Sequence, residues 1–233
     1  AIRDLIAPVA KVTPILRGLT AIAATEADAE PVRFILDFRT SPAIRDYVAG
    51  AEVARYARQG PVTPDHAIRT KPLPLIVEVP ESGDLDGFRQ RAAASVKKYA
   101  ADYRDYFGRN NAGRTVPKRP LDARPRVILV PGLGLFGIGD SGRAAGIAAD
   151  LAETTVGVIA AAGRIAGETG APWAVLTFEP HPRQFFQPAT VPFRLTPFRA
   201  KMRLLAERGV DAVFNLGFGP GLAGLKAQDF VLD

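Results

Sequence analysis

The sequence predicts an α/β protein in which a mainly parallel sheet carries helices on both faces. Short β-rich runs have the length of buried strands, and segments with helical spacing separate them. Strands that alternate with helices favour parallel pairing through right-handed crossovers, which bring the carboxyl ends of the strands to one ligand-binding edge. The expected arrangement is Rossmann-like, and a functional site should lie at that edge.

The expected strands cover residues 32–38, 73–79, 126–130, 173–178 and 212–218. The clearest helix should cover residues 86–107, because Phe88, Val96 and Tyr103 lie on one face at a period close to 3.6. A second long helix should run from residue 141 to about residue 165, with Ile147 and Val158 on its apolar face.

Two shorter helices should begin where a capping residue precedes a proline. Ser41 before Pro42 marks one of them, and Thr196 before Pro197 marks the other. Gly209 should end the second helix.

Length and composition limit the possible organisation. With 233 residues and 47% hydrophobic composition, the chain can bury a sizeable core as one large domain or two small ones. We expect one segment over residues 1–166 and another over residues 167–233, with the sheet able to continue across the boundary. The chain begins at Ala1 rather than Met and ends in what reads as the first turn of a helix, so we interpret it as a fragment.

Neither a membrane span nor a signal peptide is expected, because Pro8, Lys11 and Pro14 interrupt the apolar opening stretch. A cytoplasmic location follows by default. The absence of cysteine excludes disulfides, thiolate metal sites and a cysteine nucleophile.

The net charge of +6 indicates an affinity for anions, and basic residues crowd most in residues 109–126. Acidic and basic residues interleave elsewhere, and no aromatic ladder accompanies the cluster. This pattern argues against nucleic-acid binding and favours a small phosphorylated ligand or a nucleotide as the partner.

A glycine-rich segment lies between the third expected strand and the next helix. It contains Gly132, Gly134, Gly137 and Gly139 and ends at Ser141, which is a G-x-G-x-x-G pattern. Glycines let the backbone approach a phosphate, which the first turn of the helix can bind. The acid that should end the next strand about 20 residues later is missing, so a tight structural turn is favoured first, a phosphate site second and a nicotinamide site last.

The loop before the second expected strand contains His66, Arg69 and Lys71 within six residues. These side chains suit a sugar phosphate or a proton transfer. A proline-stiffened surface loop explains them equally well, so the residues alone leave both interpretations open.

The fourth expected strand ends in Glu179, Pro180, His181, Pro182 and Arg183, at the edge where open parallel sheets bind ligands. Proline on each side of His181 fixes the backbone and could direct the imidazole and Arg183 into the crevice. A capped turn explains the same residue types equally well.

The chain lacks the residues that several classes of catalytic site require. The chain has only two histidines, so a three-histidine zinc site cannot form and no metal site is predicted. Neither a Ser-His-Asp order nor a P-loop signature occurs. The motifs alone therefore assign no cofactor.

From about residue 7 to residue 164, the chain resembles bifunctional class II aldolase/short-chain dehydrogenases of the rhamnulose-1-phosphate aldolase type. The runs GPVTPDHAIRTK (residues 60–71) and PRVILVPGLGLF (residues 125–136) carry this resemblance. In that family they lie after the aldolase's zinc-binding histidines and before the dehydrogenase's cofactor loop. The resemblance implies that both active sites are absent and that other domains of a parent enzyme are partners.

From about residue 167 to residue 233, the chain resembles the adenylyltransferase module of bifunctional riboflavin kinase/FAD synthetases. The runs AVLTFEPHPR (174–183), PFRLT (192–196), GVD (209–211) and DFV (229–231), together with Lys201, carry the match. The resemblance implies that residues 179–183 lie beside a flavin and nucleotide pocket, with ATP and FMN as ligands and magnesium as the ion. The family's H-x-G-H motif belongs on the preceding strand-to-helix turn, which here is the glycine-rich segment without histidine.

The sequence therefore predicts a composite or truncated enzyme-derived chain without a complete active site. It should bind flavin, nucleotide or sugar phosphate weakly at the strand ends. Two alternatives stay open. One is FMN adenylyltransferase activity, with His181 replacing the missing histidine pair, and the other is a non-catalytic part of a rhamnulose-1-phosphate aldolase/short-chain dehydrogenase.

Overall fold

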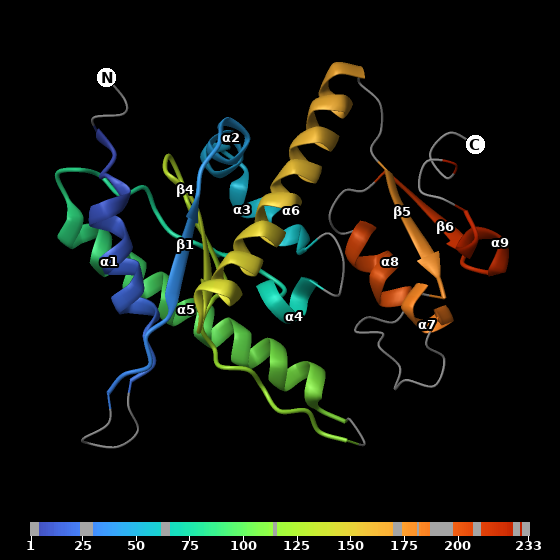
Figure 1. The fold of residues 1–233 in the computed structure, drawn as a ribbon, viewed down its shortest axis with the longest axis horizontal. Helices are drawn as coiled ribbons and strands as arrows, with labels where there is room; N and C mark the ends of the chain where they lie inside the picture. The colour runs from blue at the N-terminus through green and yellow to red at the C-terminus, as the bar shows by residue number, and fades with distance from the viewer. Residues whose placement is uncertain are drawn as a thin grey trace. The chain divides into compact units, whose positions relative to one another are not determined.

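The structure is a computed structural model, and it describes residues 5–23, 30–61, 66–113, 116–169, 174–180, 182–186, 198–206, 211–225 and 229. The chain divides into two compact units, Ala1–Ala160 and Ala161–Asp233, and each is described by itself. Figure 1 labels most of the helices and strands of both units.

The first unit contains a four-stranded sheet with the order β1-β4-β3-β2. β1 (Ile35–Arg39) and β3 (Val127–Val130) each pair antiparallel with β4 (Gly134–Gly139), whereas β2 (Leu75–Ile76) pairs parallel with β3. The expected mainly parallel, Rossmann-like sheet is therefore replaced by a mixed sheet. The cause is β4, which the sequence pattern did not predict, because a hairpin turns the chain back where a crossover helix was expected.

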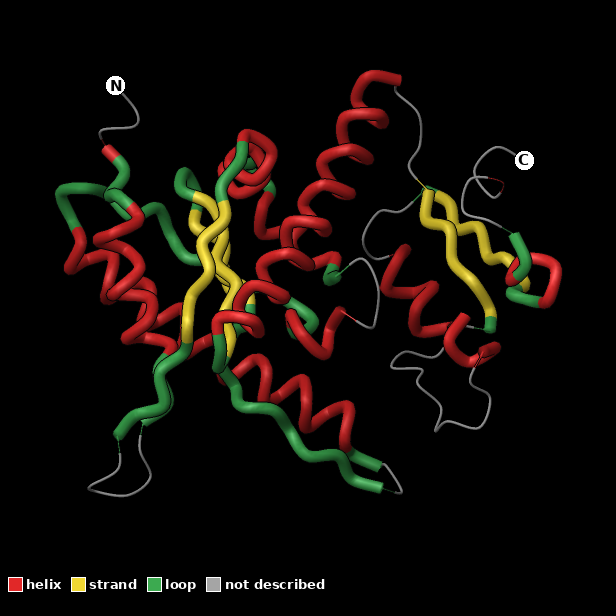
Figure 2. Tube along the Cα trace, in the orientation of Figure 1, coloured by secondary structure: helices red, strands yellow, loops and turns green. Residues whose placement is uncertain are grey.

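Two helical layers cover the sheet (Figure 2). On one face, α1 (Val9–Thr20) and α5 (Leu85–Asn111) pack on residues that include Ile128 and Phe136. On the other face, α2 (Pro42–Ala49) and α6 (Gly142–Thr169) pack on residues that include Leu129 and Leu135. Successive residues of β3 alternate between the two cores, so helices on both faces are confirmed for this unit.

The helix signals in the first unit identify real helix starts. Ser41 caps α2 by accepting a hydrogen bond from the Ile44 N–H, and Pro42 is the first helical residue. α5 begins one residue before the expected start, where Asp84, a cap that the sequence analysis did not name, accepts a hydrogen bond from the Gly87 N–H. Three short helical segments complete the unit between α2 and β2: α3 (Val53–Tyr56), η2 (Ala57–Gln59) and α4 (Ala67–Thr70).

α6 buries a different face from the one expected. Ala145, Ala149, Ala152 and Val156 are buried against the sheet, whereas Val158 is 48% exposed. The reason is that small alanine side chains let α6 lie closer to the sheet than larger residues would. In the described chain, Gly142–Ala161 is one helical stretch long and apolar enough to cross a membrane, and its alanine face packs against the sheet.

The second unit contains a two-stranded parallel sheet, as the sequence predicts for this part of the chain. β5 (Ala174–Glu179) pairs with β6 (Ala212–Gly217), and Leu176 lies opposite Phe214. The described helices of this unit that follow β5 are α7 (Pro182–Phe186), α8 (Phe198–Ala206) and α9 (Pro220–Ala223). The Thr196-Pro197 cap and the Gly209 stop lie outside the described residues.

Candidate functional site

The predicted phosphate segment forms a hairpin turn followed by a strand. The Leu133 N–H donates to the Val130 carbonyl at 3.0 Å and closes the turn. Gly132 adopts φ 77° within this turn, a conformation that favours glycine. From Gly134 onward the chain is β4, and every residue of this strand is buried. The expected open loop between strand and helix is thus largely a buried strand that pairs with β1 and β3.

Gly137 and Gly139 lie where α6 approaches β4 most closely. A Cβ on Gly137 would overlap the Ala145 carbonyl oxygen and the Ala149 backbone nitrogen. A Cβ on Gly139 would overlap the Ala145 backbone nitrogen. The glycines therefore allow direct contact between the strand and the helix backbone. The phosphate-binding role of this glycine set stays a prediction, and the structure gives two of its members a packing role.

Ser141 caps α6. Its hydroxyl accepts a hydrogen bond from the Ala144 N–H at 3.2 Å and donates one to the Asp140 carboxylate at 3.3 Å. Asp140 thus already supplies a negative charge at this helix start. The hydroxyl predicted to contact phosphate is engaged in a capping interaction.

The three side chains of the predicted sugar-phosphate set differ in their exposure. His66 is partly buried at the start of α4, and Arg69 is exposed. Lys71 is only 2% exposed, and its ammonium group donates to the Asp122 carbonyl. The ammonium also lies 3.9 Å from the centroid of the Tyr103 ring. The predicted common site would therefore require Lys71 to leave these contacts.

Lys71 belongs to a polar cluster inside the first unit. Burial lowers the pKa of Lys71 to about 8, Asp122 opposes this shift, and Arg126 adds to it. Arg126 forms a two-pronged ion pair with Asp122, one prong of which measures 3.1 Å. Burial raises the pKa of Asp122, but hydrogen bonds from Arg126 and the Arg124 N–H outweigh that effect and leave it below its ordinary value. The cluster ties the residues before β2 to those before β3.

The predicted flavin and nucleotide set lies at the carboxyl end of β5. Glu179 is the last residue of the strand, and its carbonyl accepts the Phe218 N–H at 3.1 Å, which joins this end to the residue after β6. Pro180 is exposed, and Pro182 begins α7. Arg183 belongs to α7, whereas His181 lies outside the described residues. The backbone thus places the described members at a strand end, as the sequence predicts.

An aromatic cluster that sequence reasoning missed lies beside this turn. Phe218 lies 5.6 Å from Phe178, 5.5 Å from Phe185 and 5.8 Å from Phe186, measured between ring centroids. These edge-on arrangements are favourable aromatic contacts. Phe186 is nevertheless 62% exposed. The adjacent phenylalanine pair directly after the proline turn was the signal that could have identified it.

A side-chain hydrogen bond joins α8 to β5. The Lys201 ammonium donates to the Thr177 hydroxyl at 2.7 Å. This hydrogen bond positions a cation on the sheet two residues before the strand ends. Within the described ranges, no three His, Cys, Asp or Glu side chains gather to hold a metal ion. The expected lack of a metal site stays a prediction, because His181 is not among those residues.

The first unit has a mixed three-layer α/β architecture, and the second is built on a parallel strand pair with a proline turn at its end. Comparison with protein families assigns the larger part of the chain. The chain belongs to the family described as aldolase class II, second domain, whose profile matches residues 7–177. An FAD synthetase profile matches residues 156–233. Both resemblances predicted from the sequence are confirmed at the level of the family.

Individual relatives follow the same division. An uncharacterized oxidoreductase, YuxG, from Bacillus subtilis is 27% identical over 133 residues, which cover 57% of this chain and 18% of that protein. The bifunctional riboflavin kinase/FMN adenylyltransferase of Escherichia coli K12 is 45% identical over 62 residues, which cover 27% of this chain and 20% of the enzyme. The corresponding Pseudomonas fluorescens enzyme is 45% identical over 64 residues, or 28% of this chain and 20% of the enzyme.

The chain spans about a fifth of the length of these relatives. No solved structure matches it significantly. The two family matches overlap over residues 156–177, and the compact units meet between residues 160 and 161. The predicted boundary after residue 166 stays a prediction. One chain thus carries matches to two families, an arrangement that resembles a fusion.

Proposed function

We propose that the chain binds FMN or an adenine nucleotide weakly at the carboxyl end of β5 and catalyses no reaction with it. The observation that carries this proposal is the proline turn at the end of a parallel strand, in a segment 45% identical to FMN adenylyltransferases over 62 residues. Ligands of open parallel sheets bind outside such strand ends.

The surroundings of the turn support a planar, phosphorylated ligand. The exposed face of Phe186 offers a stacking surface for a flavin or adenine ring. Lys201 holds a positive charge beside β5. A ring-binding surface with a cation nearby suits a nucleotide better than a neutral sugar.

The proposed lack of catalysis rests on the other strand-to-helix junction. The segment that would have to hold ATP phosphates contains Leu133, Leu135 and Phe136 and has no histidine. Leu135 and Phe136 are fully buried within β4. Transfer of an adenylyl group requires cationic or hydrogen-bonding groups to stabilise charge on the phosphates, and apolar side chains cannot supply them.

Calorimetric titration of the full chain with FMN, ATP and rhamnulose 1-phosphate tests the proposal. We expect weak heats with FMN or ATP, reduced in Phe186→Ala and in His181→Ala, and no FAD after prolonged incubation with FMN, ATP and magnesium. Tyr106→Phe is a suitable control, because Tyr106 is exposed on α5 in the first unit. Failure of both ligands to bind would refute the proposed binding, whereas FAD formation would refute the proposed lack of catalysis.

FMN adenylyltransferase activity is the second candidate, and the 45% identity to enzymes of that name favours it. In this mechanism His181 replaces the missing histidine pair. It predicts FAD formation from FMN, ATP and magnesium that His181→Ala abolishes. FAD formation at an unchanged rate in that variant excludes the mechanism.

A further inference from the structure

The end of α5 and the loop that follows it form a basic arm, which comprises residues 97–126. In the sequence this arm holds nine Lys or Arg residues and three Asp residues. Its net charge of +6 equals the net charge of the whole chain, so the acidic and basic residues of the other segments balance each other. The excess positive charge of the protein is therefore concentrated in one segment of the first unit.

The basic arm projects from the first unit. Ala100 is the last buried residue of α5, and none of the described residues between 101 and 124 is buried. Figures 1 and 2 show the end of α5 and the returning loop side by side, extending away from the sheet. The part of α5 after Ala100 corresponds to about 16 Å of helix. A projecting element of this length can contact a flat surface.

Hydrogen bonds hold the returning loop against α5. The Asn111 side chain donates to the Lys118 carbonyl at 3.2 Å and accepts from the Lys118 N–H at 2.8 Å. Further along the loop, the Leu121 N–H donates to the Tyr103 hydroxyl at 3.3 Å. The loop is thus ordered before it meets a partner, which lowers the entropic cost of binding.

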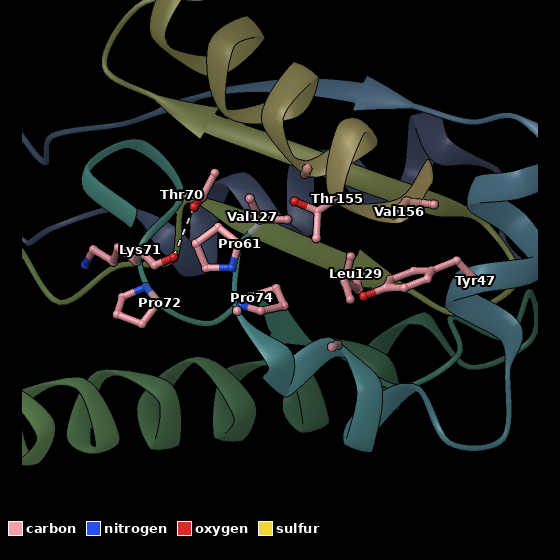
Figure 3. Close-up of a pocket in the computed structure, with 13 residues that line it drawn as sticks. Tyr47, Pro61, Thr70, Lys71, Pro72, Pro74, Val127, Leu129, Thr155 and Val156 are labelled. Atoms are coloured by element: carbon pink, nitrogen blue, oxygen red, sulfur yellow. Dashed lines mark hydrogen bonds between the residues drawn. The ribbon is translucent and has the colours of Figure 1, made fainter. Parts of the chain in front are cut away.

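Contacts at the base of the basic arm neutralise the acidic residue of the returning loop. The Arg126 guanidinium pairs with the Asp122 carboxylate, and one of its hydrogen bonds measures 3.1 Å. The Lys71 ammonium donates to the Asp122 carbonyl, and in Figure 3 it points away from Thr155 on α6. Asp122 is therefore engaged at the base and offsets little of the charge exposed further along the loop.

Exposed cations and exposed aliphatic side chains lie next to one another on the returning loop. Val116 is 66% exposed and Leu121 is 51% exposed. Between them, Lys118 and Arg119 are exposed, and neither forms an ion pair with a residue that the structure describes. Tyr106, on the adjacent α5, is 43% exposed.

This combination suits the surface of an anionic lipid bilayer. Cations attract anionic headgroups, aliphatic side chains enter the boundary between headgroups and acyl chains, and tyrosine is enriched at the same depth. A nucleic acid would engage the cations but would leave Val116 and Leu121 without partners, because single-stranded bases stack on aromatic rings.

We propose that the basic arm docks the chain on membrane surfaces that contain anionic lipid, with Lys118 and Arg119 against the headgroups and Val116 and Leu121 in the outer acyl region. The docking is peripheral and reversible. It is independent of the nucleotide binding proposed above, because the basic arm belongs to Ala1–Ala160.

Co-sedimentation of the full chain with phosphatidylcholine vesicles, prepared with and without phosphatidylglycerol, tests this inference. We expect saturable binding to the anionic vesicles alone in salt of about 0.15 M, and its loss in salt of about 1 M, where screening shortens the range of charge attraction to about 3 Å.

A double variant tests the role of charge. Lys118→Gln with Arg119→Gln should lower the affinity for anionic vesicles roughly 30-fold, since each basic residue near an anionic surface contributes a factor of about 5. Lys11→Gln with Arg45→Gln is the matched control, because it removes the same charge from exposed positions of α1 and α2. The control should change the affinity less than about 2-fold, because screening limits the reach of distant charges.

A single variant tests the role of the aliphatic side chains. Leu121→Asn should lower the affinity roughly 5-fold, because about half of a leucine side chain leaves water on docking. Ile68→Asn, at a position of α4 that is 58% exposed, should leave the affinity unchanged. All of these positions are exposed, so melting curves should show that each variant folds.

Three results would overturn the proposal. Anionic vesicles fail to bind the parent chain, the double variant of the basic arm binds them no more weakly than its control, or Leu121→Asn binds them as tightly as the parent. Fluorescence anisotropy with a labelled single-stranded oligonucleotide adds a fourth. Tighter binding to the oligonucleotide than to the vesicles, in salt of about 0.15 M, would make the basic arm a nucleic-acid site instead.

Discussion

Two strand-to-helix junctions of this chain use their residues differently. At the first, β4 leads through Ser141 into α6, and every residue of the strand is buried. At the second, β5 leads through Pro180 into α7, where Phe186 is 62% exposed. The first junction is built from glycine and alanine in close contact, and the second combines proline with exposed aromatic residues. A glycine pattern before a helix can thus serve packing rather than ligand binding.

The position of each strand in its sheet explains the difference. β4 lies between β1 and β3 and has helices on both faces, so its side chains have access to neither water nor ligand. In the described part of the chain, β5 pairs with β6 alone, and its residues are only partly buried or exposed. The carboxyl end of β5 is therefore the more accessible place for a ligand.

The largest expected effect comes from adding a side chain at the first junction. Gly137→Val should destabilise the chain by about 3 kcal/mol or more, because overpacking commonly costs about 1–3 kcal/mol and here the new atoms meet backbone that cannot rotate away. Urea unfolding, monitored by circular dichroism, measures this loss.

Gly157→Ala is the matched control, since Gly157 lies in α6 with nothing within 4 Å of an added Cβ. It should stabilise the helix by roughly 0.5–1 kcal/mol. If Gly137→Val unfolds no more easily than the parent chain, the contact between β4 and α6 is wrong, and the contrast between the junctions disappears.

The next largest expected effect is a rise in the free energy of unfolding with pH. It tests whether the first unit excludes water from Lys71. Because burial lowers the pKa of Lys71 to about 8 from 10.5, the unfolded chain binds more protons than the folded chain between these pH values, and stability rises with pH. From about pH 8 to about pH 9.5 the free energy of unfolding should rise by about 1.5 kcal/mol. The window stops there because unfolded tyrosines begin to ionise near pH 10 and oppose the gain.

Lys71→Met should remove this rise, whereas Lys97→Met, at an exposed position of α5, should retain it. Denaturant midpoints measured at intervals of half a pH unit give the comparison. A flat profile for the parent chain would show that Lys71 is hydrated, and that the first unit is more open than its burial indicates.

How much of the fold the sequence predicts depends on how local the signals are. Ser41-Pro42 and the spacing of Phe88 and Val96 identify helices, because capping and period 3.6 are properties of neighbouring residues. β4 escapes such reasoning, since a run of alternating glycines reads as a loop unless the pairing strands and the helix above it are known. The antiparallel return of the chain is a long-range property.

The candidate site residues show the same contrast between local signals, which the sequence reveals, and long-range contacts, which it does not. Residues 179–183 were placed at a strand end by the strand pattern and the family resemblance, and the described members lie there. Burial of Lys71 and its contact with Asp122 could not be predicted, because they join segments 51 residues apart.

A smaller effect sharpens the interpretation of the first junction as structural. Ser141→Ala removes the hydroxyl that caps α6 and should cost about 1 kcal/mol of stability. Inorganic phosphate should change the melting temperature of the parent and of Ser141→Ala equally. If phosphate raises the melting temperature of the parent alone, the glycine-rich segment is a phosphate site after all.

The smallest expected change in stability lies at the second junction. Phe186 is mostly exposed, so Phe186→Ala should alter the free energy of unfolding by no more than about 0.5 kcal/mol. Its affinity for FMN should fall by roughly 5-fold, because stacking contributes about 1 kcal/mol. Quenching of FMN fluorescence measures the affinity, and urea unfolding measures the stability. Loss of stability with unchanged FMN affinity would give Phe186 a packing role and make the two junctions alike.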